Sequence, residues 1–217
     1  MKLSYAGIGN RDTPEEALKE IRQIAGFLSS LGFKLRTGGG EGADENFLEG
    51  HTDRRTKKVF LPNPKFRGIK EKLNCYVQDH PSRVAMWLAS MIHPHWWTMH
   101  SSYRFLMARN LDILADFRQV EELPTTKIKL SEANNFISVD AVSLVIFYER
   151  MGHTTVKKYV KGGTNFGLFA LQKWKEAELL TTLPVMLNIM NPLDGFLAEE
   201  YAKEIKRLHH PKNLVVF

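Results

Sequence analysis

The sequence predicts an α/β protein of the Rossmann-like, doubly wound class, with a mostly parallel sheet of about six strands and helices on both faces. Short apolar runs alternate along the chain with stretches of helical periodicity, the order expected for a parallel sheet with crossover helices. The run at residues 141–148 is almost continuously apolar, which is typical of a strand buried on both faces. Three glycine clusters each follow a short apolar run and open a helical pattern.

The predicted elements begin at the first residues of the chain. We expect a strand at residues 2–8, directly before the first glycine cluster. Thr13 is expected to be the N-cap of the next helix, because Glu16 follows at the spacing of a capping box. Apolar residues then recur at helical spacing until Gly32, a residue type that often ends helices. Further strands are expected at residues 33–37, 57–61, 141–148, 183–188 and 214–217.

Two segments depart from this alternation. Residues 81–115 are predicted to be largely helical and are rich in aromatic residues and histidines. Residues 116–140 are predicted to be an irregular insertion before the strongest strand. The whole chain, residues 1–217, has the length of one sizeable core and is expected to form a single domain.

Composition narrows the class of protein. No apolar run approaches the ~20 residues that span a bilayer, and the first residues lack a signal-peptide pattern. A single cysteine, Cys75, excludes an intramolecular disulfide framework and suits a reducing compartment. We therefore expect a cytoplasmic protein that does not act on membranes. Its net charge of +6 permits a polyanionic partner without requiring one.

The first glycine cluster contains Gly7, Gly9, Asn10 and Arg11. It is not the dinucleotide fingerprint, because Asp12 stands at the third glycine position and no acidic residue ends the second strand. NAD and FAD are therefore disfavoured. A strand-to-helix turn presents backbone N–H groups to anions, and a guanidinium there suits bidentate phosphate contact. An ordinary surface arginine after a turn remains the alternative.

The second cluster is the most specific of the three. Consecutive glycines let the backbone approach a ligand closely, because no Cβ stands in the way. The acids that follow repel phosphate, so we expect them to face a ribose, a base or an N-glycosidic bond. Asp44 is alternatively a plain helix cap, and Glu41 and Glu45 are the only candidates for a catalytic acid or base. The predicted binding residues here are Gly38, Gly39, Gly40, Gly42, Asp44 and Glu45.

The third cluster also opens an apolar-periodic helix. Thr164 offers a hydroxyl and a backbone N–H to an anion, or it simply caps the helix. All three turns follow expected strands, and ligands of doubly wound sheets bind at the carboxyl ends of strands. The predicted binding residues of this group are Gly162, Gly163, Thr164 and Asn165, together with Asn188 at a strand end and the helical pair Arg109 and Asn110, for which an ordinary helix surface is the alternative.

Histidines and aromatic residues of the helical segment give weaker signals. His93, His95 and His100 lack the cysteine or carboxylate spacing of a zinc site, so no metal is predicted. Trp96, Trp97 and Tyr103 are candidates for stacking on a base, although aromatic residues at helical spacing more often belong to the core.

These residues together resemble the SLOG superfamily, the Rossmann-like group that includes DprA-type recombination mediators and LOG-type phosphoribohydrolases. The resemblance is carried by Tyr5-Ala6-Gly7-Ile8-Gly9-Asn10-Arg11 and Arg36-Thr37-Gly38-Gly39-Gly40-Glu41-Gly42-Ala43-Asp44, and it is closer to compact DprA-like proteins of bacteriophages. It implies a nucleotide-type ligand at the glycine turns and a tendency to form homo-oligomers. Gly9-Asn10-Arg11 is similar to the Gly-Ser-Arg element of the DprA single-strand-binding pocket.

Departures from the group separate three hypotheses. The position three residues beyond Thr164 holds Gly167, where the LOG enzymes carry a catalytic glutamate. Our leading hypothesis is therefore binding, without a further cofactor, of a small phosphate-bearing nucleotide ligand, for example to sense or sequester a signal in phage–host conflict. The first alternative is a DprA-like single-stranded DNA-binding protein. The second is a nucleotide N-glycosidase that uses Glu41 or Glu45 as a substitute acid or base.

Overall fold

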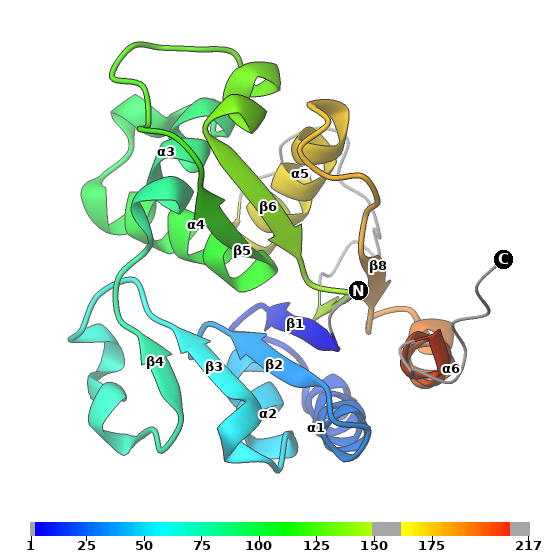
Figure 1. Cartoon of the computed structure of the whole chain (residues 1–217). Helices are drawn as coiled ribbons and strands as arrows, with labels where there is room; N and C mark the ends of the chain where they lie inside the picture. The colour runs from blue at the N-terminus through cyan, green and yellow to red at the C-terminus, as the bar shows by residue number, and fades with distance from the viewer. Residues whose placement is uncertain (1–2, 149–161, 209–217) are drawn as a thin grey trace, which may run out of the picture. The chain divides into compact units, whose positions relative to one another are not determined.

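The computed structural model describes residues 3–148 and 162–208. These residues divide into two compact units: unit 1 comprises 3–58, 142–148 and 184–208, and unit 2 comprises 59–141 and 162–183. Six strands are hydrogen-bonded in the order β4-β3-β2-β1-β7-β8, and β5 pairs with β6 in a second, two-stranded sheet (Figure 1). The predicted α/β class, with a six-stranded sheet flanked by helices, is confirmed.

Unit 1 is a parallel sheet with its own helices. In the described residues β1 pairs in parallel with β2 on one side and with β7 on the other, and β8 pairs with β7. Figure 1 shows α1 and α2 alongside β1 and β2. The elements are β1 (Ser4–Gly9), α1 (Glu15–Ser30), β2 (Lys34–Thr37), α2 (Ala43–Gly50), a 3-10 turn (Arg54–Thr56), β7 (Leu144–Tyr148), β8 (Val185–Asn188) and α6 (Pro192–Leu208).

The core of unit 1 explains its apolar sequence pattern. Tyr5, Leu35 and Ile146 share one buried cluster with Phe47 of α2 and with apolar residues of α1 and α6. The intervening Val145 of β7 is also completely buried. Both faces of the central strands are therefore covered, which is why β7 reads as a continuous apolar run rather than an alternating one.

The start of α1 differs from the prediction. The N-cap is Pro14, and no side chain caps the helix. The Thr13 hydroxyl instead donates to the backbone oxygen of Asn10 at 2.7 Å, so the residue closes the turn before the helix. The predicted capping box is wrong because the N-cap is one residue further along the chain, so Thr13 lies outside the helix and its hydroxyl bonds within the preceding turn. Gly32 follows the helix with φ of +83°, as expected for a terminating glycine.

Unit 2 contains the helical segment predicted at residues 81–115, which is confirmed. Its helices α3, α4 and α5 contact one another. Earlier in the chain, Leu61 N–H donates at 2.7 Å to the backbone oxygen of Gln78, the last residue of the short strand β4. The elements are β3 (Lys57–Phe60, which begins in unit 1), 3-10 turns (Phe66–Gly68, Lys70–Lys72, Trp96–Thr98 and Leu130–Asn135), β4 (Tyr76–Gln78), α3 (Arg83–Ile92), α4 (Ser101–Leu114), β5 (Ala115–Gln119), β6 (Ile137–Ala141) and α5 (Gly163–Glu176).

The expected irregular insertion at residues 116–140 has ordered ends. β5 and β6 pair antiparallel, with Phe117 opposite Val139. Apolar and polar residues alternate through Ile137–Ala141, the period of a strand with one covered face. Phe117 packs edge-on against Trp174 of α5, with ring centroids 5.5 Å apart. The prediction of an irregular segment is therefore wrong at both ends, because this contact with a distant helix orders them.

The strand expected at residues 214–217 lies outside the described residues. The sixth strand of the sheet is instead β4. Within the described residues, none of the helices combines the length and the apolar character needed to cross a bilayer.

Candidate functional site

Two glycine turns lie side by side in unit 1. β1 ends at Gly9 and β2 ends at Thr37, and the two strands are parallel neighbours with Gly7 opposite Thr37. The carboxyl ends of both strands therefore reach the same edge of the sheet. Across the turns, Ala43 N–H donates to the oxygen of Asn10 at 3.3 Å. The structure thus brings together the first two predicted turns.

Gly42 makes this close approach possible. Its φ is +75°, a conformation that favours glycine. A Cβ at this position would lie 2.4 Å from the backbone oxygen of Arg11 and 2.6 Å from that of Asn10. Any other residue would push the two turns apart. Within the second turn, the side-chain amide of Asn46 donates to the Gly42 oxygen at 2.8 Å.

An exposed ion pair joins the two turns at the surface. Arg11 Nε lies 3.1 Å from a carboxylate oxygen of Glu41, and the side chains are 76% and 47% exposed. Exposed pairs of this kind contribute about 0–1 kcal/mol to stability. The guanidinium therefore remains accessible to another anion, which must compete with Glu41 for it.

The buried side chain of Asp44 stabilises the second glycine turn. It is buried, and its carboxylate accepts from Gly40 N–H at 3.1 Å. The N-cap of α2 is Gly42, whose position precedes the helix, so the alternative of Asp44 as the helix cap is wrong. Gly38 and Gly39 are also buried in this turn. Asp44 thus shapes the loop backbone.

Gly7 and Gly9 serve a packing role that the sequence pattern did not reveal. A Cβ on Gly7 would lie 2.4 Å from the ring of Phe47, and one on Gly9 would lie 2.5 Å from the Cβ of Ala43. Both partners belong to α2, which contacts β1 directly. These glycines therefore allow α2 to pack closely against β1.

The helix N-termini of the three predicted turns differ in charge. The first turn of α1 carries Glu15 and Glu16, and that of α2 carries Asp44 and Glu45. The first turn of α5 contains no acidic residue. Because a carboxylate in the first turn already uses the positive end of the helix dipole, the N-terminus of α5 is the most favourable of the three for an outside anion.

In unit 2 the third glycine turn meets the predicted pair on α4. A Cβ on Gly163 would lie 2.7 Å from the amide nitrogen of Asn110, so the two residues are in close contact. Asn110 and Arg109 are both buried, and neither lies on an ordinary helix surface. Thr164 is buried inside the first turn of α5, whose N-cap is Gly162 with φ of +128°, so the alternative of Thr164 as the cap is wrong. Half-buried Asn165 lies in the same turn.

Asn188 ends β8 in a closed turn. It is completely buried, and its side-chain oxygen accepts from Met190 N–H at 3.2 Å. Its backbone N–H donates to the carboxylate of Asp194 at 2.8 Å, which ties the strand to the start of α6. Asn188 therefore stabilises the turn between β8 and α6 in unit 1.

A buried histidine anchors the far end of α2. His51 is completely buried, and its Nδ1 lies 3.1 Å from the Tyr5 hydroxyl while its Nε2 lies 2.8 Å from Thr56 Oγ1. Thr56 Oγ1 donates to the oxygen of Asp53, so it accepts from Nε2–H, and Nδ1 accepts from Tyr5. Burial, assisted by the nearby charge of Lys57, lowers the pKa of His51 from 6.5 to about 4. The histidine is neutral in the folded protein at pH 7.

The other predicted candidates separate into structural and exposed residues. Among the described residues, no three His, Cys, Asp or Glu side chains are grouped to hold a metal ion. His93 accepts from His95 N–H at 3.1 Å, and His100 caps α4. Trp96 is buried, whereas Trp97 and Tyr103 are 75% and 58% exposed. Of these three predicted aromatic candidates, Trp97 and Tyr103 are exposed enough to stack on a base.

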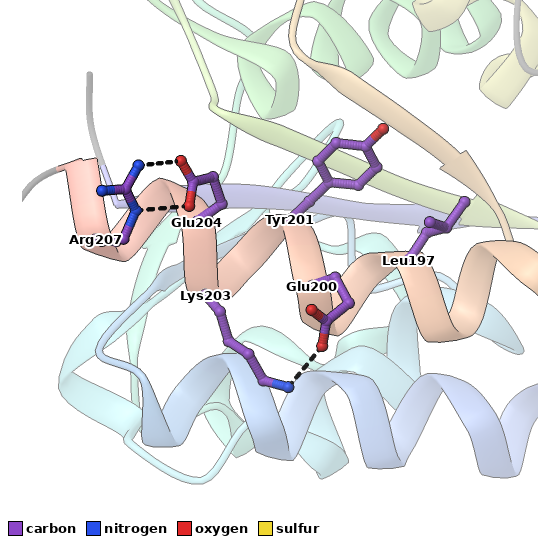
Figure 2. Close-up of a pocket in the computed structure, with 6 residues that line it drawn as sticks. All are labelled: Leu197, Glu200, Tyr201, Lys203, Glu204 and Arg207. Atoms are coloured by element: carbon purple, nitrogen blue, oxygen red, sulfur yellow. Dashed lines mark hydrogen bonds and ion pairs between the residues drawn. The ribbon is translucent and has the colours of Figure 1, made fainter.

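A hollow of about 430 Å³ lies along α6 in unit 1. Figure 2 shows Leu197 and Tyr201 beside two ion pairs, Lys203 with Glu200 at 2.8 Å and Arg207 with Glu204 at 2.6 Å. Both pairs lie within one helix, so the charges here are already satisfied by neighbours. We assign no small-molecule ligand to this hollow.

Comparisons with known proteins give one finding. A scan against family models and a search of curated proteins produce no match. The structure is similar to that of DNA processing protein A from Helicobacter pylori, whose single-stranded DNA binding mode has been described. The two share 13% sequence identity with a TM-score of 0.46, and the alignment covers 95% of this chain and 81% of the other.

Proposed function

We propose that this protein binds single-stranded DNA, with Arg11 at the paired glycine turns as a phosphate contact. The observation that carries the proposal is the exposure of the Arg11 guanidinium, 76%, on a turn held in place by backbone contacts. A small-ligand pocket encloses most of its ligand, whereas a DNA backbone is contacted by cations on an open surface. The open position of Arg11 therefore favours a strand over a mononucleotide.

Net charge supports the same proposal. The chain carries 30 Lys and Arg against 24 Asp and Glu, a formal charge of +6. Each cation that neutralises a phosphate releases condensed counterions, which provides most of the affinity of non-specific binders. The resemblance of Gly9-Asn10-Arg11 to the DprA element leads to the same ligand class. The start of α5, with no acid in its first turn, offers a second phosphate contact within unit 2.

Fluorescence anisotropy with a labelled oligonucleotide of about 20 thymidines tests the proposal. We expect saturable binding that unlabelled single-stranded DNA displaces and that mononucleotides, ADP-ribose and cyclic nucleotides do not. No detectable binding at low salt would contradict the proposal.

A small phosphate-bearing nucleotide is the second candidate. It is favoured by the start of α5, whose first turn contains no acidic residue and where Gly163 lies in close contact with the buried Asn110. Native mass spectrometry of the purified protein would detect a retained nucleotide. Such a ligand, together with failure of DNA to displace it, would favour this candidate. Release of free base from a nucleotide would instead support the hydrolase alternative, with Glu41 or Glu45 as the acid or base.

We also propose that two copies associate through α6. Leu197 and Tyr201 are 36% and 41% exposed on this helix, and Phe196 is 68% exposed. Beside them Lys203 pairs with Glu200 and Arg207 with Glu204, so these apolar side chains are flanked by charges that are already paired within the helix. Light scattering after size exclusion should show a dimer that Tyr201→Glu converts to a monomer. A wild-type monomer at all concentrations would exclude this contact.

A further inference from the structure

We propose that a groove in unit 2, walled by two tryptophans, binds one base of single-stranded DNA. The groove has a volume of about 250 Å³ and lies between α3, the 3-10 turn Trp96–Thr98 and the loop at residues 124–128. Trp87, Met91, Trp97 and Lys127 are among its lining residues. Pockets for drug-sized ligands usually have ~300–1,000 Å³, so this groove suits a single ring system. The inference rests on the proposed function, because the base belongs to the same bound strand.

Trp87 forms a fixed wall of the groove. It lies four residues before Met91 on α3, so both side chains point from the same face of the helix. The Trp87 ring packs edge-on against Phe136, with centroids 6.2 Å apart. The helix and this contact hold the indole in one orientation before any ligand arrives.

Trp97 forms the open wall. Its side chain is 75% exposed, although its neighbour Trp96 is buried. Arg104 fixes the backbone beneath it, donating to the oxygen of Trp97 and to that of Met99, both at 2.9 Å. The Arg104 guanidinium also lies 5.9 Å from the ring centroid of Trp96. The hydrogen bonds of Arg104 thus hold the backbone of this turn in place. The Trp97 indole itself is exposed to solvent and can stack on a base.

The charge of this region complements a phosphodiester chain. None of the residues that line the groove is acidic, and Lys127 contributes a cation at its edge. Residues 81–111 contain no aspartate or glutamate, although the chain has 24 of them, and they include Arg83 and Arg104. Aromatic side chains combined with such a basic surface are the usual means of binding single strands without sequence preference.

The test compares two oligonucleotides of equal length, oligo-thymidine and an abasic analogue with the same number of phosphates, by fluorescence anisotropy with the full chain. We expect oligo-thymidine to bind about tenfold more tightly, a ratio within the range measured for stacking of one base. Trp97→Ala should remove this preference and leave affinity for the abasic strand unchanged. Trp97→Phe should retain most of it. Tyr76→Ala, which truncates another exposed aromatic side chain of unit 2, should retain all of it.

The outcomes separate this inference from the proposed function. Equal affinity of the wild-type protein for both oligonucleotides, or an unchanged preference in Trp97→Ala, would contradict base binding in the groove. Either result would leave the proposal of DNA binding unaffected. Absence of binding to either strand would overturn the proposed function itself. Photocrosslinking with 5-iodouracil in the strand gives an independent readout, because crosslinks at Trp87 or Trp97 support the groove and crosslinks confined to unit 1 contradict it.

Discussion

Arg11 Nε lies 3.1 Å from the carboxylate of Glu41, and this contact joins two turns that are 30 residues apart in the sequence. The pair has a direct functional consequence. Glu41 lowers the attraction of Arg11 for an incoming phosphate, since the two anions compete for one guanidinium. In the proposed DNA complex, Glu41 would therefore weaken the contact between Arg11 and a phosphate.

Replacing Glu41 with glutamine should strengthen DNA binding. The Arg11 guanidinium would lose its anionic partner and pair with phosphate at lower cost, so we expect a rise in affinity of about 2- to 5-fold, equivalent to ~0.4–1 kcal/mol. Anisotropy titrations at constant salt measure the change. Glu176→Gln on α5 alters the net charge equally and should have a smaller effect. If both variants gain equally, the effect is one of net charge and not of the Arg11–Glu41 pair.

Substitution of Gly42 by alanine should be far more costly than the same change at Gly32. Both residues have positive φ, +75° and +83° respectively. An alanine Cβ at Gly32 would meet no atom within 4 Å, so Gly32→Ala carries only backbone strain of about 1 kcal/mol. At Gly42 the Cβ would also collide with the backbone of Arg11, and we expect a loss of about 3 kcal/mol or more. Urea unfolding of both variants checks this, and equal losses would show that the two turns do not touch.

Acid should destabilise the protein through His51. Its pKa is about 4 in the folded protein against 6.5 in the unfolded chain, so only the unfolded chain binds the proton between these values. The stability contribution is complete above pH 6.5 and is lost as pH falls to about 4, amounting to about 3 kcal/mol. Unfolding free energies of wild type and His51→Gln across this range measure the difference. An unchanged dependence in His51→Gln would contradict the assignment.

Thr37→Val should stabilise the protein. Thr37 is completely buried at the end of β2, and its hydroxyl has no hydrogen-bond partner among the described residues. Valine has nearly the same shape without the polar atom, so we expect a gain of about 1 kcal/mol. Thr13→Val is the matched comparison, because it removes a hydroxyl that does donate, to the oxygen of Asn10, and should lose about 1 kcal/mol. Thermal or urea unfolding reports both, and destabilisation by Thr37→Val would show that its hydroxyl is satisfied.

The strands buried on both faces were predictable from the sequence. β7 is a continuous apolar run, a pattern that arises from burial itself, whereas β1 ends in the first glycine cluster and β2 ends directly before the second. β4 was missed because a three-residue strand with an exposed Tyr76 has no distinctive pattern. In β6, apolar and polar residues alternate as in a strand with one buried face. The pattern was not recognised because polar residues surround this short segment, and its pairing with β5 became clear only from the structure.

The role of individual site residues was harder to predict. The clustering of the first two turns follows from strand order, and the structure confirms it. Gly7 and Gly9 resemble ligand-binding glycines in the sequence, but the atoms that exclude a Cβ there belong to Phe47 and Ala43, more than 30 residues away. Such long-range packing leaves no local pattern. The groove at Trp87 was likewise missed, because its other wall, Trp97, lies in a separate turn.

The salt dependence of DNA binding tests the central claim most directly. The logarithm of the association constant for oligo-thymidine is measured against the logarithm of salt concentration for wild type, Arg11→Lys and Arg11→Ala. A phosphate contact by Arg11 predicts weaker binding of Arg11→Ala with a slope shallower by about 0.7, the value for one contact to a single strand, while Arg11→Lys keeps the wild-type slope. Identical affinity and slope in Arg11→Ala would contradict the account.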